Sequence, residues 1–344
     1  MTNGHDRLGM MSRPSLYIDF GSCQTRIFSG ENAVFVEPSC LVLNDGQPQF
    51  IGQKAYELLG KVPAPLQHVF PVELGRVTNQ AQAKLFLMAI DRQYLPQVWW
   101  RSWLGGSGYV LTQANVGAVE KDRLMGVVRS VWAGKWRAVK RPRAIWSSIQ
   151  SEAETSQPVC IIDIGGQTTE MSLLVAGQVV MATVIEWGGM NVTELIQKQV
   201  WSLFKSAISW QTAEQLKREM VFLPGKKPVS STRTTVRGKD IVRQVGMTTV
   251  IDAKLISPAV SALVDELIEE IKLFLSQAPS NLTGSLLDAG LWLCGGGSQL
   301  MGLDARLSEQ LRYSVRLTPN PELDAIFGLR MLVQSVKQGE LTGK

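Results

Sequence analysis

Two segments of the chain share one uncommon pattern, in which a hydrophobic strand ends at an aspartate and turns at a glycine into a second strand. The pattern Asp–x–Gly–x–x–x–Thr occurs at Asp19–Thr25 and again at Asp163–Thr169, 144 residues later. Each copy is followed by a third strand-like run, at 33–43 and at 178–187. Because the whole unit recurs, the sequence indicates an internal duplication of one α/β unit. With 344 residues, the chain is long enough for two such units.

Each glycine turn has the chemistry of a phosphate-binding loop. A tight turn between two strands exposes several backbone N–H groups on one side, and these groups suit phosphate oxygens. An aspartate at the strand end can hold Mg²⁺ through water, because Mg²⁺ retains much of its hydration. One such hairpin is an ordinary feature of an α/β protein. Two matched copies predict two loops that face each other across a cleft, with phosphates between them and the metal near Asp19 and Asp163.

A third glycine turn, Gly295-Gly296-Gly297, ends an apolar strand and opens a helix. Three glycines let a flat ring approach the backbone, and a helix N-terminus favours an anion. The spacing matches neither the P-loop pattern GxxxxGK[ST] nor the dinucleotide pattern GxGxxG, so those two nucleotide-binding folds are disfavoured.

Composition excludes several classes of protein. Hydrophobic residues make up 45% and charged residues 19%, which is typical of a globular chain. The formal net charge of +5 is too small to indicate nucleic acid, and we predict no nucleic-acid partner. The four cysteines form no CxxC pair, so we expect neither zinc nor a disulfide framework, as in a reducing cytoplasm. Without a signal peptide or a run of about 20 apolar residues, we expect a soluble or peripheral membrane protein.

Several segments stand in the order of one known family. They are Ile18–Ser22 with Thr25, Val36–Ser39, Ile51–Pro63, Asp163–Glu170, Thr212–Glu219, Val236–Gly238, Gly295–Gly297 and Leu303-Asp304. Together they resemble the MreB branch of the actin superfamily over about residues 15–335. The resemblance implies an α/β, two-lobed actin-like fold, with duplicated ribonuclease-H-like cores and a nucleotide cleft between them. The first lobe would cover 1–155, with a small subdomain at about 33–80. The second would cover 156–344, with a small subdomain at about 190–255.

The resemblance also assigns roles to residues in this cleft, where ATP and Mg²⁺ would bind. Asp19 and Asp163 would hold the metal through water, and Glu214 and Lys217 would meet the ribose and adenine. The remaining assigned residues would contact the phosphates or border the base. Those at the phosphates are Gly21, Ser22, Cys23, Gly165, Gly166, Gln167 (where glycine is usual in the family) and Thr168, and those at the base are Gly295, Gly296 and Gly297.

As function, the resemblance implies a homopolymer of paired protofilaments on the inner face of the cell membrane. It would organise cell shape and wall synthesis together with membrane-bound elongation machinery such as RodZ or MreC. One alternative is a non-hydrolysing scaffold of the same fold that serves as an adapter. Another is a small-molecule kinase of the wider superfamily, which is disfavoured because we find neither a catalytic group for an acceptor hydroxyl nor the usual larger insertion.

The chain departs from the family where a glutamate orients the attacking water. The corresponding run, Val139–Ala144, places Arg141 at that position, and 132–151 contains no Asp or Glu. A guanidinium stays protonated and cannot accept a proton from water. Losing a general base commonly slows a reaction by ~10²–10⁴-fold. We therefore expect at most a slow ATPase, with Thr168 the nearest matched candidate for positioning water and Arg141 available for the terminal phosphate.

Two further segments carry expectations. Phe70–Gly75 lacks the Lys-Asp-Gly of relatives, which removes an expected polar contact near the cleft. Trp99, Trp100, Trp103 and Leu104 precede a Gly-Gly-Ser-Gly turn, at the position where the family inserts a hydrophobic loop into the membrane. Tryptophan favours the membrane–water boundary, so we expect membrane insertion here. The alternative is a tryptophan cluster packed on the lobe.

Overall fold

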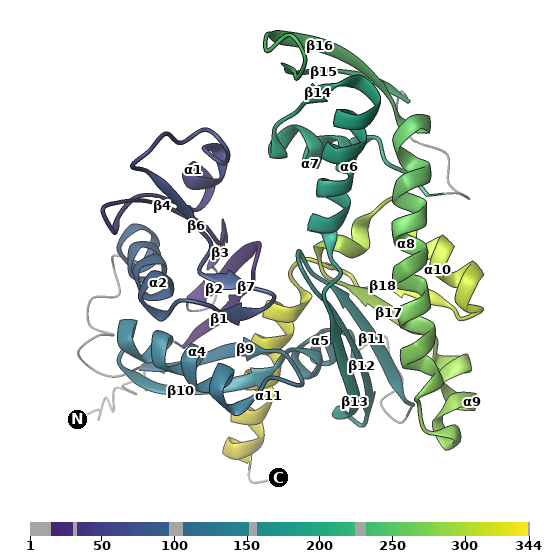
Figure 1. Cartoon of the computed structure of the whole chain (residues 1–344). Coiled ribbons are helices and arrows are strands. Elements are labelled where there is room, and N and C mark those ends of the chain that lie inside the picture. Colours follow the sequence, from purple (N-terminus) through teal and green to yellow (C-terminus); the bar gives the residue numbers. More distant parts are fainter. Residues whose placement is uncertain (1–14, 30–32, 96–105, 151–156, 224–231, 343–344) are drawn as a thin grey trace, which may run out of the picture.

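The computed structural model describes residues 15–29, 33–95, 106–150, 157–223 and 232–342. Two five-stranded sheets form its centre (Figure 1). In spatial order, the first sheet contains β10 (Gly134–Lys140), β9 (Gly106–Thr112), β1 (Leu16–Phe20), β2 (Gln24–Ser29) and β3 (Ala33–Pro38). The second contains β13 (Gln178–Ile185), β12 (Thr169–Val175), β11 (Val159–Ile164), β17 (Leu291–Cys294) and β18 (Val315–Leu317).

The two sheets repeat one topology strand for strand. In each, the motif hairpin and the strand after it run antiparallel, as β1–β2–β3 and as β11–β12–β13. In each, the first motif strand also pairs in parallel with a later strand, which pairs in parallel with the edge strand. The duplication inferred from the two Asp–x–Gly–x–x–x–Thr patterns is therefore present in the fold.

Helices and smaller sheets surround this centre (Figure 1). The first half adds α1 (Gly52–Glu57), α2 (Gln80–Tyr94), α4 (Ala118–Val131) and α5 (Arg141–Ile149), a sheet of β4 (Leu41–Asn44), β5 (Gln47–Ile51) and β6 (Gln67–Val69), and the hairpin β7 (Val72–Glu73)–β8 (Arg76–Val77). The second half adds α6 (Gly189–Phe204), α7 (Trp210–Glu219), α8 (Ala253–Ser276), α9 (Ser280–Ala289), the 3₁₀ turn η2 (Gly296–Gln299), α10 (Leu303–Leu311) and a sheet of β14 (Ser206–Ala207), β15 (Arg233–Asp240) and β16 (Gly246–Asp252).

The C-terminal helix α11 (Asp324–Thr342) joins the two halves behind the sheets. It packs along α5 and touches β1 and β9, although it follows the second sheet in the chain. One continuous buried cluster combines side chains of both sheets and both helices, among them Tyr17, Leu111, Ile145, Ile161, Trp292 and Leu329. The two lobes thus share a core at their base, so α5 and the strands it touches are held in one fixed relation.

The structure contains three features that the sequence patterns described above do not specify. The basic segment before Arg143 forms the edge strand β10 and the start of α5, with Trp136 buried and Lys135 and Arg137 exposed. Charged side chains on an edge strand discourage pairing with other chains. Helix α8 begins at Ala253, five residues before Pro258, and the Asp252 carboxylate caps it by accepting from the Lys254 amide at 3.0 Å. The third feature is helix α9, which follows α8 directly.

Among the described residues, no helix is long and apolar enough to cross a membrane. The tryptophan segment Trp99, Trp100, Trp103 and Leu104 lies outside the described residues, so its membrane role stays a prediction.

Candidate functional site

A cleft of about 1020 Å³ lies between the two halves of the molecule. Both motif hairpins and the triple-glycine turn contribute to its walls. All residues that the sequence assigned to nucleotide or metal line it: Asp19, Gly21, Ser22, Cys23, Arg141, Asp163, Gly165, Gly166, Gln167, Thr168, Glu214, Lys217, Gly295, Gly296 and Gly297. Positions separated by up to 278 residues therefore meet in one place, while their individual roles toward a ligand stay predictions.

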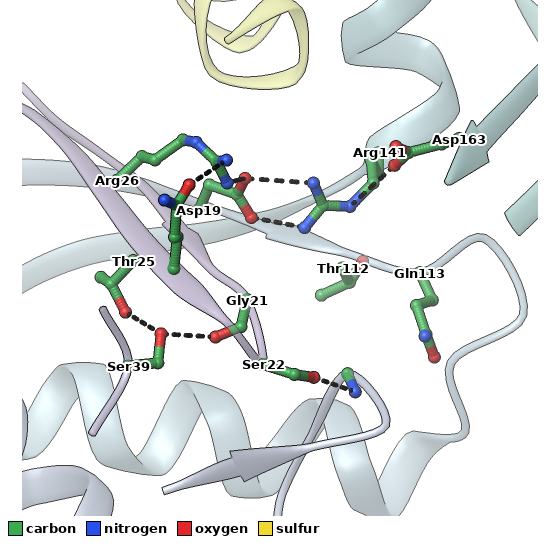
Figure 2. A network of polar contacts seen from close by, with 12 residues as sticks. Asp19, Gly21, Ser22, Thr25, Arg26, Ser39, Thr112, Gln113, Arg141 and Asp163 are labelled. Atoms are coloured by element: carbon green, nitrogen blue, oxygen red, sulfur yellow. Dashed lines mark hydrogen bonds and ion pairs between the residues drawn. The ribbon is translucent and has the colours of Figure 1, made fainter. Parts of the chain in front are cut away.

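The two motif hairpins are built in the same way. The Gly21 amide donates to the Gln24 carbonyl at 3.2 Å, and the Gly165 amide donates to the Thr168 carbonyl at 2.8 Å. The threonine that closes each motif is buried and ties its turn to the end of the third strand. Thr25 lies 2.8 Å from the Ser39 hydroxyl, which itself donates to the Gly21 carbonyl at 2.6 Å (Figure 2).

Thr169 plays the equivalent part in the second copy, since its hydroxyl donates to the Trp187 carbonyl at 2.7 Å. The recurring threonine thus stabilises the loop. It does not face the ligand space.

Glycine is required in these loops because they touch one another. A Cβ at Gly166 would overlap the side chain of Cys23, so the two hairpins meet across the cleft. Gly295 has φ +81°, and a Cβ there would overlap both the Asp163 carboxylate and the Ile164 carbonyl. The third turn is therefore packed directly on the second loop, which leaves backbone rather than side chains facing the cavity. Such walls fit a nucleotide's phosphates and flat base.

Glu214 and Lys217 of α7 form an ordered polar group with Gly189 and Thr193 of α6. The Lys217 ammonium donates to Glu214 at 2.8 Å, to the Gly189 carbonyl at 3.0 Å and to Thr193 at 3.0 Å. The Thr193 hydroxyl donates to Glu214 at 2.7 Å. Burial raises the pKa of Glu214, but Lys217, Thr193 and Arg218 together outweigh it and hold that pKa below its usual value. These contacts hold Glu214 and Lys217 in fixed positions at the wall of the cleft.

Two contacts that the sequence did not indicate connect the two halves across the cleft, and a third ties the β7–β8 turn to Ser22 within the first half. The Leu74 amide donates to the Gln167 side chain at 2.7 Å, and the neighbouring Gly75 amide donates to Ser22 at 2.9 Å. Farther out, Gln211 donates to the Tyr56 carbonyl at 2.7 Å. Leu74 and Gly75 belong to the segment where the family's Lys-Asp-Gly is missing. The backbone of the β7–β8 turn therefore reaches the side chain of Gln167, the residue that replaces a usual glycine.

Arg141 lies at the centre of the site, between the aspartates that begin the two loops (Figure 2). Its Nη1 donates to Asp19 at 3.1 Å, its Nη2 donates to the other oxygen of Asp19, and its Nε lies 3.7 Å from Asp163. Arg26 adds a contact to Asp19 at 3.3 Å. Arg141 is the first residue of α5, so this helix start aims the guanidinium at the ends of β1 and β11.

These ion pairs control the charge of the two aspartates. Burial raises the pKa of Asp19, but the guanidinium groups of Arg141 and Arg26 outweigh it and hold that pKa below its usual value. For Asp163 the same burial outweighs the more distant Arg141, and the pKa is raised. Asp19 is therefore the firmly ionised member of the pair.

The arrangement does not fit a divalent cation between the two carboxylates. Both oxygens of Asp19 already accept from guanidinium groups, and Arg141 occupies the space toward Asp163. Within the described part of the chain, no three His, Cys, Asp or Glu side chains come together as a metal site. The expectation that Asp19 and Asp163 hold Mg²⁺ through water finds no supporting geometry here.

Glu170 is a further residue of the cleft wall that sequence reasoning missed. It is 4% exposed, and one carboxylate oxygen accepts from the Ala114 amide at 2.6 Å. The other oxygen is buried and has no hydrogen-bond partner among the described residues. Burial raises the pKa of Glu170 to about 7, in spite of the Ala114 amide and Arg141. The sequence signal that could have identified Glu170 was its position directly after Thr169 in the second motif.

Known proteins resemble nearly the whole chain. A sequence model of the MreB/Mbl protein family matches residues 13–340. The cell shape-determining protein Mbl of Bacillus cereus is 23% identical over 332 residues, which are 93% of this chain and 95% of Mbl. The cell shape-determining protein MreB of Escherichia coli is 26% identical over 323 residues, which are 91% of each chain.

Solved structures agree with the sequence match. MreB5 of Spiroplasma citri bound to AMPPNP superposes with a TM-score of 0.88 at 21% identity, covering 97% of this chain and 99% of that one. The MamK double helical filament gives a TM-score of 0.75 at 18% identity, covering 93% and 99%. The two-lobed actin-like fold predicted from the sequence is confirmed, and the chain belongs to the MreB/Mbl protein family.

Proposed function

We propose that the protein binds ATP in the central cleft and assembles into filaments of paired protofilaments that organise cell shape and wall synthesis. The observation that carries this proposal is the meeting of two matched glycine hairpins and a triple-glycine turn around one cavity. These are the three backbone surfaces that phosphates and a flat base require, and Glu214 with Lys217 supplies polar groups beside them.

Family membership supports the cellular part of the proposal. The relatives named Mbl and MreB are described as cell shape-determining proteins, MreB5 was solved with AMPPNP, and MamK was solved as a double helical filament. We propose the same nucleotide binding and self-assembly for this chain. We place it in the cytoplasm, on the inner face of the cell membrane, with membrane-bound elongation machinery such as RodZ or MreC as partner. Neither the kinase alternative nor a nucleic-acid partner is favoured by any feature of the cleft.

Hydrolysis is expected to be slow, because Arg141 stands where the family's water-orienting glutamate is expected and is held there by Asp19. In single-turnover assays on polymer, the rate should lie at least ~10²-fold below that of E. coli MreB measured alongside, as for the loss of a general base. A rate equal to that of E. coli MreB would contradict this expectation and leave nucleotide binding untouched. A polymer that binds ATP and never turns it over would match the non-hydrolysing scaffold.

Filament formation on lipid tests the proposal as a whole. Purified protein with ATP and vesicles containing anionic lipid should form paired protofilaments on the vesicle surface in electron micrographs. Replacing Trp99, Trp100 and Trp103 with serine should abolish vesicle pelleting and leave filaments in solution, because tryptophan side chains favour the membrane–water boundary. Monodisperse particles at all ATP concentrations would overturn polymer formation. Pelleting of a folded triple variant would instead exclude this segment as the anchor.

A further inference from the structure

A guanidinium stands where the two phosphate loops begin, in direct contact with the carboxylates at the ends of β1 and β11 (Figure 2). Asp19 is 1% exposed and Arg141 is 19% exposed, so this contact is largely removed from water. It spans both lobes, since Asp19 belongs to the first sheet and Asp163 to the second.

The formal charges of this cluster already cancel. Asp19 and Asp163 contribute two negative charges, and Arg141 and Arg26 contribute two positive ones. Mg²⁺ gives up its water reluctantly and is held in proteins by anionic oxygens. Here a divalent cation would meet carboxylates that are already engaged, and it would be repelled by Arg141 at short range with little water between them.

The guanidinium can take over the role of that cation toward phosphate. Arginine carries five N–H donors in a planar fork that matches phosphate oxygens. Nη1 and Nη2 each donate one N–H to Asp19, and Nε lies 3.7 Å from an oxygen of Asp163. Among the described residues, the hydrogen bonds of Arg141 go to Asp19 alone, and Arg141 lines the cleft, so the second N–H of Nη1 and of Nη2 is available to a ligand there. Charge-assisted bonds of this kind are about twice as strong as neutral ones.

We propose that this cleft binds the polyphosphate of a nucleotide without a divalent cation, with the Arg141 guanidinium supplying the positive charge between the two loops. This inference rests on the nucleotide binding proposed above and adds the form of the ligand, which is the metal-free nucleotide. It also gives Arg141 a ligand-binding role in addition to its ion pairs with the two loop aspartates.

The test compares ATP affinity in EDTA with ATP affinity in excess Mg²⁺, by calorimetric titration of the full chain. For the wild-type protein, the two dissociation constants should agree within about threefold. Arg141→Gln should weaken binding in EDTA by about 10–100-fold, as for the loss of a hydrogen bond to a charged group. Arg137→Gln removes the same charge from an exposed position of β10 and should leave both constants unchanged.

A second measurement needs only the wild-type protein and stays informative if Arg141→Gln fails to fold. In electron paramagnetic resonance titrations, the protein–ADP complex should bind Mn²⁺ no more tightly than free ADP does. ATP binding that requires Mg²⁺, or a protein–ADP complex that binds Mn²⁺ more tightly than free ADP, would overturn the metal-free inference and leave the proposed function standing. Absence of ATP binding in both buffers would overturn the proposed function as well.

Discussion

Gly328→Ala is expected to destabilise the folded protein by about 1–2 kcal/mol. Gly328 lies where α11 crosses α5, and a Cβ there would overlap the Ala144 carbonyl oxygen, with the carbonyl carbon at 2.6 Å and the Ser148 amide at 3.2 Å. Backbone atoms cannot rotate out of the way, so the two helices would have to separate. Overpacking of this kind costs about 1–3 kcal/mol and occasionally more, which exceeds the gain of up to about 1 kcal/mol from alanine in a helix.

The crossing also sets the position of the cleft residues. Arg141 is the first residue of α5, so a shift of this helix would move the guanidinium away from Asp19 and weaken nucleotide binding as well. Urea denaturation and ATP titration of the same variant would measure both effects. Gly284→Ala is the matched control, because Gly284 lies in α9 with nothing within 4 Å of its added Cβ, and it should stabilise slightly. Equal stability of the two variants would refute the close crossing.

Glu170→Gln is expected to change how stability depends on pH. In the folded protein the pKa of Glu170 is raised to about 7 from an ordinary 4.5, because burial disfavours the charged carboxylate. Between these two pH values the unfolded chain releases the proton while the folded chain retains it. Rising pH therefore favours unfolding, and the loss is complete above the folded pKa. From pH 5 to pH 8 this one group should remove on the order of 2–3 kcal/mol of stability, at about 1.4 kcal/mol per pKa unit.

Glutamine keeps an oxygen to accept from the Ala114 amide and carries no titratable proton. The stability difference between Glu170→Gln and the wild-type protein should therefore grow in favour of the variant from pH 5 to pH 8, in urea denaturation without nucleotide. Glu270→Gln makes the same substitution at an exposed position of α8 and should follow the wild-type protein at both pH values. A constant difference between wild type and Glu170→Gln would show that Glu170 is ionised throughout this range.

Regular elements with strong local patterns were predictable from the sequence. The motif strands β1 and β11 are continuous apolar runs because they are buried on both faces, and the glycine after each aspartate marks the turn. The sequence patterns described above do not include strand β10, although its alternation of Trp136 with Lys135 and Arg137 has the period of a strand. Its charged side chains suit an edge strand. Whether a strand lies at the edge depends on the order of strands in the sheet and not on the segment itself.

The residues of the candidate site could be predicted from the sequence, but the contacts between them could not. Glycine and aspartate positions follow from local backbone requirements, so Gly21, Gly165 and the residues around them could be named. From the sequence, Arg141 could be recognised only as the residue that replaces an expected glutamate. That it would turn toward Asp19, 122 residues earlier, depends on where α5 begins relative to both sheets. The same holds for the Leu74 amide, whose contact with Gln167 is made by backbone and leaves no residue signature.

The sequence by itself determined that two copies of one α/β unit face a common cleft with glycine loops, because hydrophobic runs and glycine turns act over a few neighbouring residues. Only the tertiary structure decided what charge the loops meet there. Hydrophobic patterning places a helix on a sheet without specifying which carboxylate an arginine at its first turn will reach. The packing of α5 between the two sheets and α11 decided that, and it put a guanidinium between Asp19 and Asp163.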